Sequence, residues 1–142
     1  MKLKIFNGQI ITPYRIIPEG TILIDGNKIT AVSGGNIEAE DAINIDAGGN
    51  YIAPGFIDIH IHGGGGYSFM DGTVEAFLKI AEAHARFGTT SLSPTTLSCS
   101  KEDLITVLDC YEEADKTNDK GAQFIRMHLE GPYLAKSQCG AQ

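Results

Sequence analysis

The first fifty residues alternate hydrophobic and polar positions in short runs, and turn-forming residues separate these runs. Alternation with a period of two is typical of β-strands that have one buried face. The sequence Asp25-Gly26-Asn27 lies between two such runs and favours a tight hairpin turn. We therefore predict a small antiparallel β unit with strands over residues 3–7, 9–12, 21–24, 29–32 and 42–45.

From residue 51 the pattern changes to strand, loop and helix in turn. A stripe containing Phe77 and Ile80 is typical of an amphipathic helix that Gly88 ends, and Ser100 with Asp103 is a capping pair for a second helix. Strands separated by helices imply right-handed crossovers and a parallel sheet. The predicted strands cover residues 56–62, 89–96 and 124–130, and the predicted helices cover residues 74–87 and 100–114.

The number of strands limits the architecture. A closed (β/α)₈ barrel takes about 250 residues, and a βαβ unit takes roughly 30, so only three strands fit after residue 51. We therefore expect an α/β chain that is the N-terminal portion of a longer enzyme.

Composition and charge narrow the partners. The chain has 142 residues, 42% of them hydrophobic and 20% charged, as in soluble globular proteins. Its net charge of −7 and the lack of a Lys/Arg cluster argue against nucleic acid. No apolar run is long enough for a membrane span or a signal peptide, so we expect no membrane partner and a cytoplasmic protein. Cys99, Cys110 and Cys139 lack CxxC spacing and are expected to be reduced.

The first candidate chemistry lies in the segment Pro54-Gly55-Phe56-Ile57-Asp58-Ile59-His60-Ile61-His62-Gly63. Residues i and i+2 of a strand project to the same face, so His60 and His62 can present both imidazoles to one cation. The alternative is a strand end with one packed and one hydrogen-bonded histidine. The glycines at 63–66 lack side chains that would block a ligand, which favours the metal site.

A second candidate group ends the third predicted strand, in His128-Leu129-Glu130-Gly131-Pro132. Glu130 can complete the coordination of a cation that two imidazoles bind, or it can be a surface acid at a strand end. His128 shares its face and is interpreted as a group that supports a metal ligand or packs in the core. His84, on the apolar stripe of the first helix, is expected to be packed or hydrogen-bonded outside the site.

A rival enzyme class also has to be considered. The string His62-Gly63-Gly64-Gly65 is similar to the oxyanion loop of lipases and esterases. That class needs a Gly-x-Ser-x-Gly elbow, which this chain lacks. The chain also lacks the glycine motifs that bind nucleotides.

Together these motifs resemble the amidohydrolase superfamily, whose first barrel strand carries a His-x-His pair and whose N-terminal part forms a small sandwich. The segments 88–96 and 128–133, with Gly140-Ala141-Gln142, resemble the N-acetylglucosamine-6-phosphate deacetylase family along almost the whole chain. This resemblance implies a small β-sandwich segment over residues 1–52. It further implies that residues 53–142 form the first βα units of a metal-dependent (β/α)₈ (TIM) barrel that is incomplete in this chain.

The resemblance also implies a site. Glu130 would be a metal ligand, and His60 and His62 would bind a further metal, giving one or two divalent ions, with zinc as the first choice and iron, manganese or cobalt as alternatives. The backbone at Ala141 would contact the sugar phosphate. The general-base aspartate and two further metal histidines would lie beyond Gln142, so no catalytic residue is expected within this chain.

The implied activity is hydrolysis of the acetamide of N-acetylglucosamine 6-phosphate to glucosamine 6-phosphate and acetate, with a homodimer as the full-length state. Two alternatives stay open. The chain could belong to another deacetylase or cyclic amidase of the superfamily, or it could be an inactive fragment that lacks the C-terminal catalytic residues.

Overall fold

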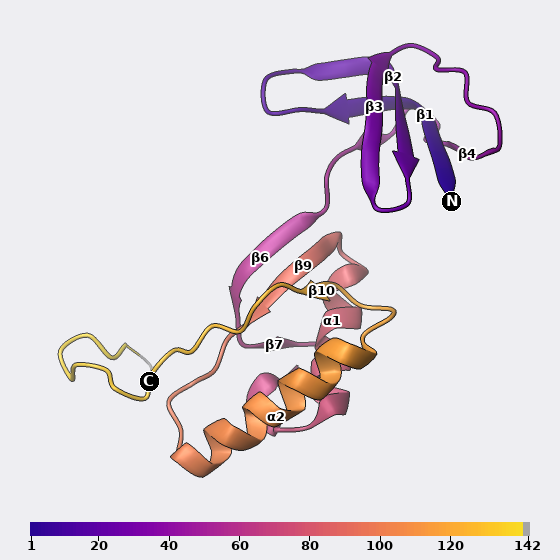
Figure 1. The fold of residues 1–142 in the computed structure, drawn as a ribbon. Coiled ribbons are helices and arrows are strands. Elements are labelled where there is room, and N and C mark those ends of the chain that lie inside the picture. The colour runs from indigo at the N-terminus through magenta and orange to yellow at the C-terminus, as the bar shows by residue number, and fades with distance from the viewer. Residues whose placement is uncertain (141–142) are drawn as a thin grey trace. The chain divides into compact units, whose positions relative to one another are not determined.

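A computed structural model describes residues 1–140 of the chain. Two compact units divide the chain, one of residues 1–54 and one beginning at residue 55 (Figure 1). The first unit holds one five-stranded sheet, and the second holds a three-stranded and a two-stranded sheet.

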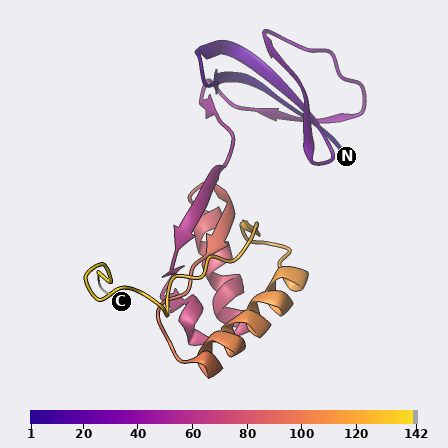
Figure 2. The same cartoon turned by 60° about the vertical axis from the view of Figure 1, so that its left-hand side comes forward.

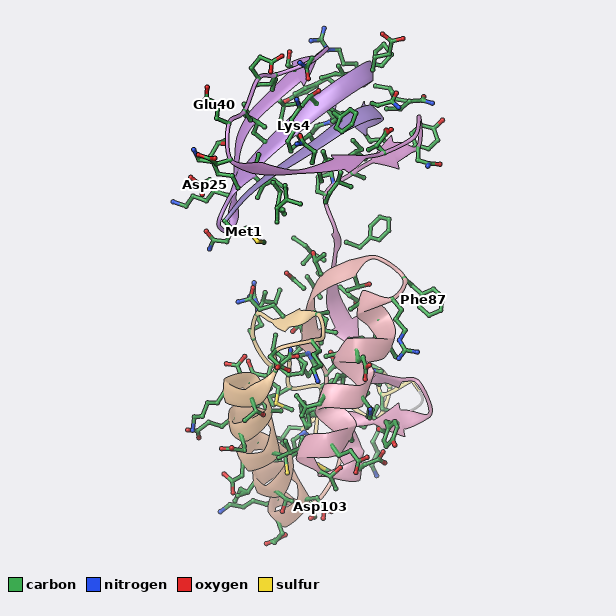
Figure 3. The ribbon with its side chains drawn as sticks, turned by 90° about the vertical axis from the view of Figure 1, so that its right-hand side faces the viewer. Met1, Lys4, Asp25, Glu40, Phe87 and Asp103 are labelled. Atoms are coloured by element: carbon green, nitrogen blue, oxygen red, sulfur yellow. The ribbon has the colours of Figure 1, made fainter. Side chains whose placement is uncertain are left out.

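The first unit is a five-stranded sheet in the order β3-β2-β1-β4, with β5 also paired to β1. Strands β1, β2 and β3 are antiparallel neighbours, and the predicted hairpin turn at Asp25-Gly26-Asn27 is confirmed between β2 and β3. Met1 and Asp25 form a terminal ion pair at 4.0 Å and lie side by side in Figure 3. The strands are β1 (Lys2–Ile11), β2 (Ile16–Asp25), β3 (Lys28–Gly34), β4 (Ala42–Asp46) and β5 (Tyr51–Ile52).

The predicted small antiparallel β unit differs from the structure in two respects, one in strand division and one in strand direction. Residues 3–7 and 9–12 belong to one continuous strand, because Asn7 takes a left-handed conformation with φ 56° inside β1 and the register shifts there without a turn. The Asn7 side chain donates to Asp46 Oδ1 at 2.8 Å and ties this irregularity to β4. Both β4 and β5 pair with β1 in parallel.

The second unit contains a parallel sheet in the order β10-β9-β6, as predicted for strands separated by helices. Figures 1 and 2 show both helices on the same side of this sheet. No helix of the described residues is long and apolar enough to cross a membrane. The elements are β6 (Phe56–Ile61), β7 (Gly63–Gly64), β8 (Tyr67–Ser68), the 3₁₀ turn η1 (Phe69–Asp71), α1 (Val74–Ala85), β9 (Thr89–Pro94), α2 (Lys101–Thr117) and β10 (Gln123–Phe124).

Local sequence sets the ends of both helices. The Thr73 side chain accepts a hydrogen bond from the Ala76 N–H at 3.2 Å and begins α1, which ends two residues before the predicted position. Ser100 accepts from the Asp103 N–H at 3.1 Å and donates to Asp103 Oδ2 at 2.8 Å, which confirms the predicted cap of α2. Figure 3 shows Asp103 at that end of the helix. Helix α2 continues to Thr117, three residues beyond the prediction.

The third predicted strand, residues 124–130, is regular only at β10. Beyond it, the N–H groups of Ile125 and His128 still donate to carbonyls of β9 at 3.1 and 2.8 Å, and the Thr96 N–H donates to the His128 carbonyl at 3.0 Å. Only a single bridge, between Thr95 and His128, continues the parallel pairing. Within the described residues this segment has a neighbouring strand on one side only, which is β9, so it forms few strand hydrogen bonds. It still runs parallel to β9 in the position predicted for the third strand.

The helices and the sheet of the second unit enclose an aromatic core. Phe77 of α1 is fully buried, and its ring centroid lies 4.8 Å from that of Phe69, 6.1 Å from Tyr111 and 6.0 Å from Phe124. Leu92 places β9 in the same cluster. Phe77 therefore connects α1, α2, β10 and the turn η1.

We predict that Phe77→Ala lowers the free energy of unfolding of this unit by about 3–5 kcal/mol, because a buried ring leaves a cavity that its neighbours fill only in part. Phe87→Ala is the matched control, since this ring is 85% exposed and should change stability by less than about 0.5 kcal/mol. Urea titration followed by far-UV circular dichroism measures both values. Equal stability of the two variants would show that Phe77 does not anchor the core.

Candidate metal centre

The candidate site forms where the parallel segments of the second unit end. His60 is the next-to-last residue of β6, and His62 follows that strand directly. Glu130 lies two residues beyond the bridge that joins His128 to Thr95, the residue directly after β9. Because parallel strands present their carboxyl ends at one edge of the sheet, residues seventy positions apart in sequence come together here.

Three side-chain atoms converge at this edge. His60 Nε2 lies 3.1 Å from Glu130 Oε2, His62 Nε2 lies 3.2 Å from the same oxygen, and the two histidine Nε2 atoms are 3.3 Å apart. The side chains of His60, His62 and Glu130 are 47%, 37% and 29% exposed, so the group is open to solvent. Within the described residues it is the cluster of histidine and carboxylate groups suited to a metal ion.

The dimensions of this triangle suit a divalent ion. Ligand atoms held at about 2.0–2.1 Å from a tetrahedral zinc ion are separated by roughly 3.3–3.4 Å. The three measured edges of 3.1, 3.2 and 3.3 Å lie close to that separation. Two imidazoles and one carboxylate are also ligands that zinc, iron, manganese and cobalt accept.

One hydrogen bond fixes the tautomer of the neutral His62 ring. Its Nδ1–H donates to the Thr95 carbonyl oxygen at 3.2 Å, and a carbonyl can only accept. In the neutral ring this leaves the lone pair on Nε2, the atom that faces Glu130 and His60. Metal-ligating histidines are commonly held in this way, with the second ring nitrogen donating to a carbonyl or carboxylate.

His60 is held from two sides. Its backbone N–H donates to Asp58 Oδ1 at 3.2 Å, and its ring packs edge-to-face on His128 with centroids 4.8 Å apart. The Nδ1 atom of His128 is buried and has no hydrogen-bond partner, and His128 is not one of the three convergent donors. Its assignment as a supporting or packing residue stays a prediction.

The glycines after His62 have a structural reason that differs from the predicted open access. Gly63 and Gly64 form β7, which pairs with β8, and His84 Nε2 donates to the Gly63 carbonyl at 3.2 Å. A Cβ atom on Gly64 would overlap the His84 ring. The expectation that His84 is a hydrogen-bonded histidine outside the site is therefore confirmed, and the glycines allow close packing beneath the site.

Sequence reasoning missed two residues that contact this site. Thr95 and Thr96 end the segment that begins as β9, and both are fully buried. Two adjacent threonines after a proline, at the end of a predicted strand, were the available sign of such a role. Ala141, the predicted contact to the sugar phosphate, lies outside the described residues.

Known proteins match the chain along nearly its whole length. It is 33% identical over 142 residues to the N-acetylglucosamine-6-phosphate deacetylase of Haemophilus influenzae, covering 99% of this chain and 36% of that protein. The crystal structure of N-acetylglucosamine-6-phosphate deacetylase from Pasteurella multocida is similar with a TM-score of 0.87 at 28% identity, covering 99% of this chain and 37% of that one. The N-acetylgalactosamine-6-phosphate deacetylase of Escherichia coli O157:H7 is 33% identical over 90 residues, covering 63% of this chain and 24% of that protein. No protein-family model matches the chain.

Solved structures of an amidohydrolase and of a D-hydantoinase share this fold, with TM-scores of 0.58 and 0.59 at 18% and 24% identity. The chain is homologous to N-acetylglucosamine-6-phosphate deacetylases and matches the N-terminal portion of those proteins. The chain spans about a third of the length of the curated relatives that it matches, 36% and 35% in two cases.

We predict that Gly64→Ala destabilises the second unit by about 1–3 kcal/mol, since the added methyl group would meet the His84 ring. In a His84→Ala background the same substitution should cost clearly less, which a double-mutant cycle by thermal unfolding measures. Equal costs in both backgrounds would show that His84 does not require glycine at this position.

We also predict that one zinc ion binds with high affinity at the three donors and that Glu130→Ala weakens this binding strongly, leaving only the residual affinity of the histidine pair. Isothermal titration with Zn²⁺ measures the stoichiometry and affinity of both forms. Glu113→Ala is the control, because Glu113 is an exposed acid on α2 far from the edge of the sheet in sequence. Unchanged affinity in Glu130→Ala would refute the assignment.

Proposed function

We propose that the protein carrying this chain hydrolyses the acetamide of N-acetylglucosamine 6-phosphate to glucosamine 6-phosphate and acetate, a step in the breakdown of amino sugars. The observation that carries the proposal is the convergence of His60, His62 and Glu130 on one point, in a chain that matches this family over 99% of its length. Because the chain covers only about a third of its relatives, the proposal concerns the complete protein.

Amide hydrolysis requires an activated water, stabilisation of the oxyanion and a proton for the departing amine. A bound divalent ion lowers the pKa of water toward about 7 and polarises the carbonyl, which supplies the first two. Glu130, His60 and His62 would hold that ion. The hydrogen bond from His62 to the Thr95 carbonyl keeps Nε2 available for it without a further change of tautomer.

The proton transfers need a separate general base and acid. The two aspartates nearest the site in sequence already have structural partners. Asp58 accepts from the His60 N–H, and Asp71 Oδ2 accepts from the Ser68 N–H at 2.9 Å as part of a capping box. This supports the proposal that the catalytic aspartate lies in a part of the protein beyond Gln142.

A second substrate has a specific observation in its favour. The relative from Escherichia coli O157:H7, an N-acetylgalactosamine-6-phosphate deacetylase, is 33% identical over 90 residues, the same identity as the relative from Haemophilus influenzae. N-acetylglucosamine 6-phosphate and N-acetylgalactosamine 6-phosphate differ only in the configuration at one ring carbon. The complete protein is therefore proposed to discriminate them through residues outside this chain.

Several finer expectations from the sequence stay predictions. These are zinc as the resident metal, a second ion, a homodimer as the full-length state, a cytoplasmic location and the contact at Ala141. The inactive-fragment alternative also stays open for the 142 residues by themselves.

We predict that the complete protein releases acetate from N-acetylglucosamine 6-phosphate faster than from N-acetylgalactosamine 6-phosphate, and much faster than from unphosphorylated N-acetylglucosamine. Glu130→Ala should abolish turnover, because the carboxylate ligand is lost, and Glu113→Ala should leave it unchanged. An acetate-release assay with metal analysis of each variant tests this. Near-normal turnover of Glu130→Ala at normal metal content would refute the role of Glu130.

A further inference from the structure

Thr95 and Thr96 lie between the two segments that carry the candidate metal donors. These segments are called arms here: residues 60–62 carry the histidines, and residues 128–130 carry Glu130. Both threonines are buried, at 0% and 1% exposure, directly after β9, the central strand of the sheet. Buried hydroxyl groups need partners, because an unpaired polar group is costly to remove from water. Both hydroxyls here accept from the two neighbouring segments that carry the donors.

Thr96 contacts the arm that carries the glutamate. The backbone N–H of Glu130 donates to Thr96 Oγ1 at 3.1 Å, and the Thr96 N–H donates to the His128 carbonyl at 3.0 Å. The segment around Glu130 has lost its regular ladder, so these bonds take the place of strand pairing. The Thr96 hydroxyl therefore sets the position from which the Glu130 carboxylate extends.

Thr95 contacts the arm that carries the histidines. The Ile61 N–H, between His60 and His62, donates to Thr95 Oγ1 at 3.1 Å, and this hydroxyl donates in turn to the Ser93 carbonyl at 3.2 Å. The Thr95 N–H donates to the Ile61 carbonyl at 2.8 Å, and its own carbonyl accepts from His62 Nδ1 at 3.2 Å. One residue thus fixes both the backbone of the pair and the tautomer of His62.

We infer that Thr95 and Thr96 are positioning residues for the metal centre, with Thr96 acting on Glu130 and Thr95 acting on His60 and His62. This inference rests on the proposed function, because it takes the three donors to be metal ligands. Neither hydroxyl touches the convergent donor atoms. Each acts through the backbone of the segment that it accepts from, and each arm has its own threonine.

The test compares Thr→Val, which removes the hydroxyl at similar volume, with Thr→Ser, which keeps it. Partners that orient metal ligands are worth about 10- to 100-fold in metal affinity. Thr96→Val and Thr95→Val should therefore bind Zn²⁺ at least tenfold more weakly by isothermal titration of the complete protein, while Thr96→Ser and Thr95→Ser should stay within about threefold of the parent. Thr90→Val, an exposed position on β9, is the matched control.

A crossed set of double variants separates positioning from a general effect on folding. In the Glu130→Ala background, Thr96→Val should no longer change the residual Zn²⁺ affinity, because its arm has no ligand left. Thr95→Val should still lower that affinity, because the histidine pair remains. Melting temperatures of the metal-free variants identify loss of affinity that comes from unfolding.

The outcomes distinguish the two proposals. If the parent protein does not bind Zn²⁺, the metal centre itself is refuted. If the parent binds and the Val variants bind equally well, or if Ser fails to restore affinity, the positioning inference is refuted while the metal centre stands. Weaker binding by both Val variants, rescue by both Ser variants and the crossed pattern of the double variants support the inference.

Discussion

The candidate site depends on the parallel pairing of three segments around one central strand. Neighbouring strands lie about 4.8 Å apart, so the segments on either side of β9 are separated by roughly 10 Å. The donors on these segments can meet only above the end of β9, and both neighbours must end at the same level. The pairing of Ile61 with Pro94 and of His128 with Thr95 sets that level.

The two faces of the sheet have different roles, one in the core and one in the candidate site. Leu92 of β9 and Phe124 of β10 point into the aromatic core beneath the helices, where Phe77 joins the elements. Side chains alternate along a strand, so burial of one set leaves the other for polar groups. His60 and His62 share one of these sets, and the capped helices therefore hold the sheet in place without contributing a ligand of the triad.

Periodic and local features could be predicted from the sequence. The i, i+2 spacing of His60 and His62, the Ser100 cap and the turn at Gly26 each depend on residues that are close together in the chain. Long-range pairing was harder. The continuation of β1 through Asn7 depends on a bond to Asp46, thirty-nine residues away, and the parallel pairing of β4 has no local pattern.

The same limit applies within the site. Glu130 was proposed as a ligand from a motif and a family resemblance. Its short distance from the histidines depends on the order of the strands in the sheet, which the sequence indicates only by analogy with known folds. In the sequence, Thr95 and Thr96 are ordinary residues at the end of a predicted strand. Their role becomes visible only from the hydrogen bonds that their hydroxyls accept from the adjacent segments. Gly64 was likewise interpreted as leaving space for a ligand. Its actual role is contact with His84, which lies twenty residues further along the chain on a helix and cannot be recognised from the local sequence.

The most direct test of the central claim is anomalous X-ray scattering at the zinc absorption edge from crystals of the zinc-loaded protein. A peak within about 2.0–2.2 Å of His60 Nε2, His62 Nε2 and Glu130 Oε2 is the predicted result. Crystals that contain zinc but show no peak between these three atoms would contradict the account.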